Sequence, residues 1–313
     1  MDLNGFAPFD RVLGRTRCTG NLGAVSEASL PSTDSIYNLT LSCQDRPGIV
    51  YAVTGALVEA GCNIVDSQQY GNPNSGRFFM RVAVTTGTSH ADLQRALQPV
   101  TGTFSMQWSL NPQGAKMRTL LMASKSAHCL NSLLFQQRTG TLPIDVPIIV
   151  SNHTDLADMA AFYGIEFRHI PVTPDTKGEA EQALRDLVAE YDIELVVLAR
   201  YMQILSNELC TDLQGKAINI HHSFLPSFKG ARPYHQAHDR GVKLIGATAH
   251  YVTPDLDEGP IIEQEVIRVD HAKSAEQFVA LGRDVEARTL ATAVQWHAEH
   301  RVLLDGQRTV VFN

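Results

Sequence analysis

Two polar residues, Asn219 and His221, stand where an apolar stretch ends, in the sequence NIHHSFLP at 219–226. The residues before them favour a β-strand, and residues two apart on a strand point to the same side. Ile220 then points the other way, into the core. If the alternation continues, His222 also points away from Asn219 and His221. An amide beside an imidazole can polarise a carbonyl group, stabilise an oxyanion and move protons. The spacing alone leaves ordinary polar loop residues as the alternative.

An acidic loop follows farther along the chain, in TPDLDEGP at 253–260. It carries Asp255, Asp257 and Glu258 between two stretches that favour strands. A carboxylate in such a loop can orient a water molecule, accept its proton and favour the charged form of a neighbouring histidine. Taken alone, the loop is equally compatible with a solvated acidic turn.

The histidine-rich stretch 221–238 raises the question of a metal site, because His235 and His238 are three apart on a predicted helix. The chain has no H-E-x-x-H motif and no closely spaced cysteine pair, so we expect no metal. An odd number of widely spaced cysteines also argues against a disulfide framework and favours the reducing cytoplasm. The five are Cys18, Cys43, Cys62, Cys129 and Cys210.

Two further turns precede predicted helices. The turn ASKSAH at 123–128 contains no glycine, unlike the glycine-rich turns that bind phosphate at a helix start. His128 is there either a ligand contact or a polar residue at the helix end, and we expect Cys129 to be buried rather than nucleophilic. The turn QDRPGIV at 44–50 is either a ligand-binding loop or a tight strand-to-helix turn.

The elements that must position these residues form two blocks. The first, from 36 to 111, reads strand, helix, strand, strand, helix, strand, which predicts a ferredoxin-like βαββαβ unit with an antiparallel sheet and helices on one face. After a linker at 112–116, apolar strands alternate with amphipathic helices over 117–313, which predicts a Rossmann-like, mostly parallel sheet in an α/β fold. Ligands bind such sheets beyond the carboxyl ends of the strands, where Asn219 and the residues after the strand 193–199 lie.

Bulk properties exclude several classes of protein. Of the 313 residues, 44% are hydrophobic and 19% charged, as in globular proteins. No apolar run is long enough for a membrane span, so we expect no membrane association. A formal net charge of −7 argues against nucleic acid as a partner. Residues 1–35 are rich in Gly and Ser without sustained periodicity, and we expect them to form a flexible extension.

Taken together, the motifs resemble a known superfamily. The segment from AINIHHSFLP to DLDEGPII is similar to the core of the hydrolases and transferases that use formyltetrahydrofolate, whose catalytic triad of Asn, His and Asp matches Asn219, His221 and Asp257. Three features resemble the deformylases in particular: His222 where the glycinamide ribonucleotide transformylases usually have Pro, the glycine-free turn at 123–128, and a leading block at 36–111 that looks like an ACT domain. The chain also ends too soon for the extra domain of methionyl-tRNA formyltransferases.

The resemblance implies a hydrolase that converts 10-formyltetrahydrofolate and water to formate and tetrahydrofolate, with no permanently bound cofactor. Asn219 and His221 would stabilise the oxyanion, and Asp257 would position water and keep the histidine proton in place. The folate ring would lie against an apolar group of residues, with Gln203 standing where the transferases often have Arg. The expected folate contacts are Met202, Gln203, Ile204, Leu205, Val252 and Leu256, and the expected glutamate-tail contacts are Lys229 and Arg232.

The ACT-like block implies regulation and assembly. ACT-like domains commonly pair between subunits and bind amino acids, so the resemblance implies a homo-oligomer with an amino-acid effector such as glycine or methionine. The candidate effector residues are Asp45, Pro47, Gly48 and Asn63. Two alternatives remain beside the hydrolase: a formyltransferase to an amine of the glycinamide ribonucleotide type, and an amino-acid sensor whose large domain has lost activity.

Overall fold

The computed structural model of the protein describes residues 35–225 and 232–313. The extension expected over 1–35 therefore lies outside the described residues, apart from Ser35 at the start of the first strand.

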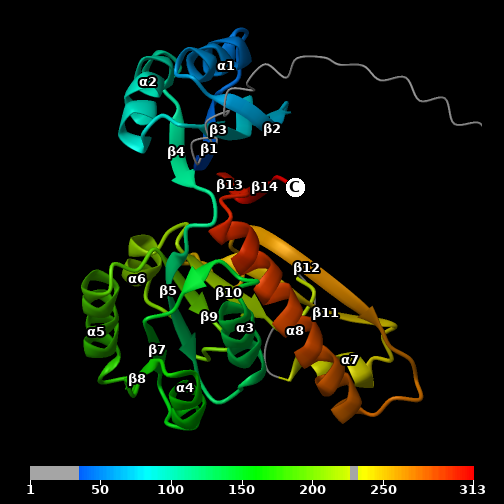
Figure 1. Cartoon of the computed structure of the whole chain (residues 1–313). Helices are drawn as coiled ribbons and strands as arrows, with labels where there is room; N and C mark the ends of the chain where they lie inside the picture. Colours follow the sequence, from blue (N-terminus) through cyan, green and yellow to red (C-terminus); the bar gives the residue numbers. More distant parts are fainter. Residues whose placement is uncertain (1–34, 226–231) are drawn as a thin grey trace, which may run out of the picture. The chain divides into compact units, whose positions relative to one another are not determined.

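The first block forms a four-stranded antiparallel sheet with the order β2-β3-β1-β4. Helices α1 and α2 lie together on one face of it (Figure 1), as the sequence predicts. Their apolar residues, such as Val53 and Leu93, join Leu39 and Val82 of the sheet in one core. The elements are β1 (Ser35–Gln44), α1 (Ile49–Glu59), β2 (Asn63–Asn72), β3 (Arg77–Thr86), α2 (His90–Thr103) and β4 (Gln107–Pro112).

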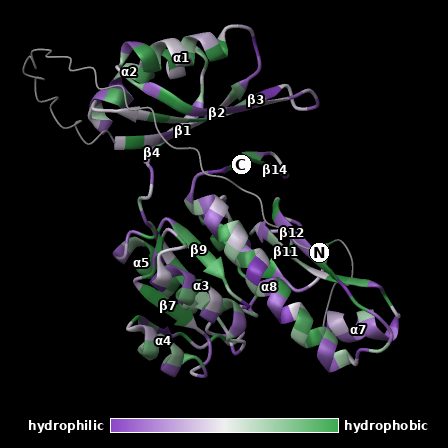
Figure 2. Cartoon of the chain, turned by 45° about the vertical axis from the view of Figure 1, so that its right-hand side comes forward, coloured by the Kyte–Doolittle hydropathy of each residue, from purple (hydrophilic) through white to green (hydrophobic). Residues whose placement is uncertain are grey.

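The second block is built on an eight-stranded sheet with the path β12-β11-β10-β9-β5-β7-β8, and β6 pairs with β5. Strands from β8 to β10 on this path pair in parallel, whereas β11 and β12 are antiparallel. Strands β7 and β9 are buried along their whole length and are mostly hydrophobic, as their green colour in Figure 2 shows. The strands are β5 (Met117–Ala123), β6 (Ile144–Asp145), β7 (Ile148–Ser151), β8 (Glu166–His169), β9 (Leu195–Leu198), β10 (Ala217–His221), β11 (Leu244–Tyr251) and β12 (Ile261–Arg268).

Two separate cores show that helices cover both faces of this sheet. Alternate residues of one strand face opposite cores: Leu121 packs with α3, α4 and α8, and Leu120 packs with α5 and α6. This arrangement is the predicted doubly wound one. The helices are α3 (His128–Thr139), α4 (Ala157–Tyr163), α5 (Lys177–Glu190), α6 (Asn207–Asp212), α7 (Pro233–Asp239) and α8 (Ala275–Ala298).

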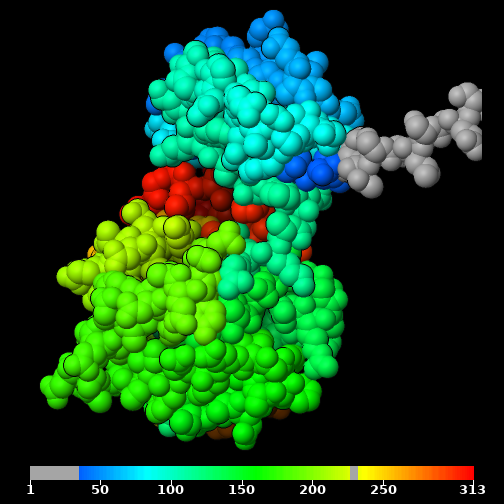
Figure 3. All heavy atoms as spheres, turned by 60° about the vertical axis from the view of Figure 1, so that its left-hand side comes forward, coloured from blue at the N-terminus to red at the C-terminus, as the bar shows by residue number. Residues whose placement is uncertain are grey.

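Figure 3 shows one side of the second block, where residues coloured green and yellow-green make up most of the surface and red C-terminal residues are also exposed. The short elements β6 and α6 were missing from the sequence prediction. A two-residue strand has no periodicity to detect, and α6 is only six residues long, although Ser206 caps it in the usual way by accepting from the Leu209 amide. The last two strands, β13 (Val302–Asp305) and β14 (Arg308–Val311), pair as an antiparallel hairpin.

Among the described residues, no helix has both the length and the apolar composition that crossing a membrane requires.

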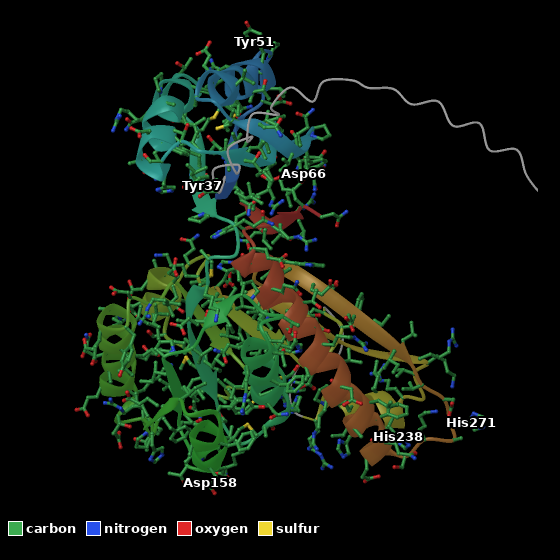
Figure 4. All side chains as sticks on the ribbon, in the orientation of Figure 1. Tyr37, Tyr51, Asp66, Asp158, His238 and His271 are labelled. Carbon is green, nitrogen blue, oxygen red and sulfur yellow. The ribbon has the colours of Figure 1, made fainter. Side chains whose placement is uncertain are left out.

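Helices α7 and α8 pack closely, and a glycine makes this possible. Figure 4 places His238 of α7 beside α8, where its ring centroid lies 5.4 Å from that of Phe278. On the facing side of α8, a Cβ atom at Gly282 would lie 2.2 Å from Cζ of Tyr234, so no side chain fits there. The position of Tyr234 therefore depends on Gly282.

We expect Gly282→Ala to destabilise the protein by about 1–2 kcal/mol, because overpacking outweighs the better helix propensity of alanine. The matched control is Gly178→Ala in α5, where a Cβ meets nothing within 4 Å, so this variant should gain up to ~1 kcal/mol. Urea denaturation of both variants measures the difference. Equal stability of the two variants would contradict the close packing.

Candidate active site

A cavity of about 260 Å3 opens at the carboxyl ends of β9 and β10. This is the edge at which an open α/β sheet binds its ligands. Its wall combines the segment after β9, the end of β10 and the loop after β11. Its lining residues include Arg200, Met202, Gln203, Ile204, Leu205, Asn219, His221, His222, His250, Val252, Leu256 and Asp257.

Asn219 and His221 both line this cavity. Asn219 pairs in register with Leu198 of β9 on one side and with His250 of β11 on the other, so central strands fix its position. Ile220 is buried in the core between them. His221 is only 5% exposed, which places its imidazole at the floor of the cavity rather than in solvent.

Asp257 is brought back to this pair by the loop between β11 and β12. The loop is closed by the Tyr251 amide, which donates to the carbonyl of Pro260 at 2.9 Å. Gly259 packs against the Tyr251 carbonyl so tightly that any side chain there would collide with the backbone. Asp257 itself has a φ of 56°, a left-handed conformation that non-glycine residues rarely adopt and that clusters at functional sites.

The geometry joins the carboxylate to the imidazole directly. Nδ1 of His221 lies 3.2 Å from Oδ2 of Asp257, and since an ionised carboxylate only accepts, Nδ1 donates. This leaves Nε2 of His221, which is buried and has no hydrogen-bond partner in the described part of the chain. A ring nitrogen held in this way is available to a bound reactant.

His250 completes the group and was not among the residues singled out from the sequence. Its Nδ1 lies 2.9 Å from the Tyr251 carbonyl and donates to it, while its Nε2 lies 3.3 Å from Nδ2 of Asn219. Nε2 is also 3.7 Å from Oδ1 of Asp257. These contacts arise because Asn219 of β10 and His250 of β11 pair in the antiparallel register. The sequence does not reveal which residues of two strands pair.

Asp257 is ionised in this setting. Burial alone would raise the pKa of Asp257, but its interactions with His221 and His250 outweigh burial and hold the pKa well below the usual range. The negative charge is therefore present at any pH near neutrality, opposite the two imidazoles.

His222 also lines the cavity, so the expectation that it points away is wrong. Strand β10 ends at His221, and the side-to-side alternation does not extend beyond it. The His222 ring lies 5.1 Å from the His221 ring. Burial, with the nearby positive charges of Arg200 and His221, lowers the pKa of His222 to about 4, so it is neutral at neutral pH.

The six residues predicted to contact a folate ring all line this cavity. Three of them expose large apolar side chains, with Met202 58%, Ile204 62% and Leu256 57% exposed. Apolar side chains gathered at a cavity mouth favour a flat, largely apolar ligand. Asp255 and Glu258, the other acids of the 253–260 loop, are exposed and do not line the cavity.

The glycine-free turn at 123–128 supports the cavity rather than presenting a phosphate site. The hydroxyl of Ser124 accepts from the Met202 amide at 2.9 Å and donates to Oδ1 of Asn152 at 2.7 Å. The Ser124 amide in turn donates to the carbonyl of Arg200. The turn after β5 thus anchors the cavity segment after β9.

A second polar group surrounds Glu286 of α8, which is 1% exposed. Its carboxylate lies 2.8 Å from Nε2 of His128, accepts from the Tyr234 hydroxyl at 2.7 Å, and lies 3.4 Å from Nε of Arg200. Burial opposes ionisation of Glu286, but these partners lower its pKa below the usual range. The sequence suggested His128 only as a ligand contact or helix-end residue, and nothing in the periodicity of α8 marks Glu286 as its partner.

Metal binding has one geometric candidate within 35–225 and 232–313. Donor atoms of His128, Cys129 and Glu286 all lie within 4.8 Å of one another. Burial and the Glu286 charge raise the pKa of Cys129 well above its usual value, which disfavours the thiolate that a metal needs. The histidines of 221–238 form no such group among the residues described.

The remaining predicted contacts lie elsewhere. Lys229 falls in 226–231, outside the described residues. Arg232 lines a neighbouring cavity with Glu286 rather than the one around Asn219. The candidate effector residues Asp45, Pro47 and Gly48 precede α1 and are exposed, as is Asn63 at the start of β2, and Gly48 has a φ of 95° that favours glycine.

Comparison with known proteins agrees with both blocks. The Formyl transferase family matches residues 117–294, and the ACT domain family matches residues 37–100. A formyltetrahydrofolate deformylase from Corynebacterium sp. (strain P-1) is 53% identical over 277 residues, which cover 87% of this chain and 96% of the relative.

Solved structures give the same picture. A formyltetrahydrofolate deformylase from Burkholderia mallei superposes with a TM-score of 0.87 at 51% identity, covering 89% of this chain and all of that chain. A glycinamide ribonucleotide transformylase from Symbiobacterium toebii is more distant, with a TM-score of 0.60 at 29% identity over 64% of this chain and 97% of its own.

We expect Glu286→Gln to destabilise the protein by about 3 kcal/mol at neutral pH, because a buried charge network loses its carboxylate. Since the folded pKa of Glu286 is lowered, its stabilising effect is present above the ordinary glutamate pKa and is lost as the pH falls through the folded value. The gap between variant and wild type should therefore persist from neutral pH to the ordinary glutamate pKa of ~4.3 and shrink as the pH falls below it. Urea denaturation at pH ~7, ~4.5 and ~3 tests this.

The control is Tyr234→Phe, which removes one hydrogen bond to the same carboxylate and should cost about 1 kcal/mol with little pH dependence. A Glu286→Gln variant as stable as wild type at neutral pH would show that the ion pairs contribute nothing.

Proposed function

The chain belongs to the formyltetrahydrofolate deformylase family, and we propose that it hydrolyses 10-formyltetrahydrofolate with Asn219, His221 and Asp257 as catalytic residues. The single observation that supports this most is the contact of 3.2 Å between His221 and Asp257, in one cavity with Asn219. The products are formate and tetrahydrofolate. The formate would supply one-carbon units for purine synthesis. No permanently bound cofactor or metal enters the proposal.

The chemistry follows from the hydrogen bonds. Asp257 orients the attacking water and keeps the proton on Nδ1 of His221. As the water oxygen bonds to the formyl carbon, the carbonyl oxygen becomes an oxyanion, and the side chains of Asn219 and His221 stabilise it. Nδ2 of Asn219 lies 3.3 Å from Nε2 of His250, a contact that positions the amide beside the oxyanion.

Collapse of this intermediate breaks the bond from carbon to N10 of the folate. N10 gains a proton, relayed from the water through Nε2 of His221, and the second proton is released as formate ionises. Nε2 suits this role because it is buried and no other group competes for it among the described residues.

The folate ring lies in this proposal against the apolar mouth of the cavity, with Met202, Ile204 and Leu256 on its faces. Gln203, Leu205 and Val252 complete the site, and backbone groups of the same segments read the donors and acceptors of the ring. We keep Lys229 and Arg232 as proposed contacts of the glutamate tail.

We further propose that the ACT-like block makes the enzyme a regulated homo-oligomer in the cytoplasm. Exposed apolar side chains on this block, Tyr51 at 85%, Val58 at 64% and Val65 at 53%, support an interface. Asp45, Pro47, Gly48 and Asn63 form the proposed amino-acid site. The four described cysteines are free and buried, which suits a reducing compartment. The domain limits proposed are 36–111 and 117–313 with a linker at 112–116.

An acceptor-free assay tests the reaction. Wild-type protein with 10-formyltetrahydrofolate alone should release formate, whereas a formyltransferase would release none without an amine. Asp257→Asn should lower kcat about 10³-fold with an unchanged circular dichroism spectrum, because water and His221 lose their orienting charge.

Asp255→Asn is the matched control, since Asp255 lies in the same loop but outside the cavity. It should turn over at the wild-type rate. Near-normal turnover by Asp257→Asn would refute the role of Asp257, and formate release that requires an added amine would refute the hydrolase.

Calorimetric titration with a panel of amino acids tests the effector site. We expect glycine or methionine to release or absorb heat with the wild-type protein, and Gly48→Ala to weaken that binding, because an alanine at a φ of 95° distorts the turn. No heat with any amino acid would contradict the proposed regulation.

A further inference from the structure

A second cavity, of about 510 Å3, adjoins the catalytic one. The two share Arg200, Met202 and His222 in their walls. The rest of the second wall comes from the start of α3, from α7 and from α8. His222 thus lies in the wall between the first cavity, which has an apolar mouth, and the second cavity.

The second cavity is lined by excess positive charge. Three arginines, Arg200, Arg232 and Arg283, line it together with one carboxylate, Glu286. That carboxylate is already engaged by His128 and by the Tyr234 hydroxyl, at 2.8 and 2.7 Å. Glu286 therefore neutralises at most part of the positive charge on the wall.

Arg200 has unused hydrogen-bonding capacity at the junction of the two cavities. Its Nε lies 3.4 Å from Glu286, which holds the guanidinium in place. Its Nη1 is buried without a hydrogen-bond partner among the residues described. Arg283 on α8 is exposed, and within the described chain it takes part in no ion pair. Guanidinium groups left in this way favour small oxyanions.

The reaction proposed above, on which this inference rests, produces such an anion. When the bond from carbon to N10 breaks, the formyl carbon leaves as formate beside Asp257. Asp257 is ionised and repels the product. The neutral His222 does not hold it, and the positively charged side chain that lines both cavities is Arg200, whose Nη1 has no hydrogen-bond partner among the described residues.

We propose that the second cavity is an anion-binding chamber that takes up the formate released by hydrolysis. Arg200 receives the carboxylate at the junction, and Arg283 attracts it along α8 toward solvent. Formate thus leaves on the opposite side of His222 from the folate, and the two products separate by different routes. The chamber is larger than formate, so free phosphate should also fit, and the test distinguishes the two.

Product inhibition by formate tests this on the full chain, with 10-formyltetrahydrofolate varied and ionic strength held constant with chloride. Formate should inhibit noncompetitively, because Arg200 and Arg283 bind it outside the cavity that holds the folate ring. Arg283→Gln should raise the inhibition constant about fivefold, the effect of one partly exposed charge pair. Arg288→Gln is the matched control on the same helix, where the guanidinium pairs with Glu265, and it should leave the constant unchanged.

Formate that competes with the folate, or equal inhibition constants in the two variants, would overturn the proposal. Calorimetric titration with phosphate and with formate, without turnover, shows which anion the chamber binds. If phosphate binds in a way that depends on Arg283 and formate does not bind, the chamber is a phosphate site and the proposed formate route is overturned. Protein that releases no formate in the acceptor-free assay overturns the proposed function instead, and the two titrations still test the chamber.

Discussion

The ionised carboxylate of Asp257 contacts the imidazole of His221 at the end of β10, and several features of the second block hold that contact in place. Burial penalises the charge on Asp257, and only the two histidines opposite it make ionisation favourable. Each of those histidines is fixed by a different device. His221 ends a central strand, and His250 donates to the backbone of its neighbour Tyr251. The loop that carries Asp257 can close only because Gly259 has no side chain.

A second buried carboxylate, Glu286, organises the other side of the site. It lies on α8 and gathers partners from three separate parts of the chain: His128, Arg200 and Tyr234. Tyr234 reaches it because Gly282 leaves room on the same helix. Removing one partner from such a group leaves a charge unpaired in a medium of low dielectric constant, so its members act together. Arg200 links this group to the cavity around Asn219, since it lines that cavity and also the cavity beside Glu286.

The two cavities differ in the chemistry of their walls, and this difference matches the two products of the proposed reaction. Apolar side chains surround the mouth of the first, where a flat ring would lie, and arginines line the second, where a small anion would be attracted. His222 stands between them with a pKa of about 4 and carries no charge at neutral pH. A neutral wall separates the negative Asp257 from the positive chamber without binding the product itself.

The sequence alone determined the two blocks and the order of their main elements, because periodicity and short motifs are local properties of a chain. The resemblance of its motifs to a known superfamily pointed to Asn219, His221 and Asp257, which the structure brings together in the wall of one cavity. It also indicated the apolar segment 202–205, which does line the cavity. The tertiary structure decided what depends on pairing between distant segments. The register of β10 with β11 places His250 against Asn219, the end of β10 turns His222 into the wall, and the packing of α8 brings Glu286 to His128 and Arg200. A chain encodes these contacts only through the packing of the whole sheet and its helices, so no short stretch of residues reveals them.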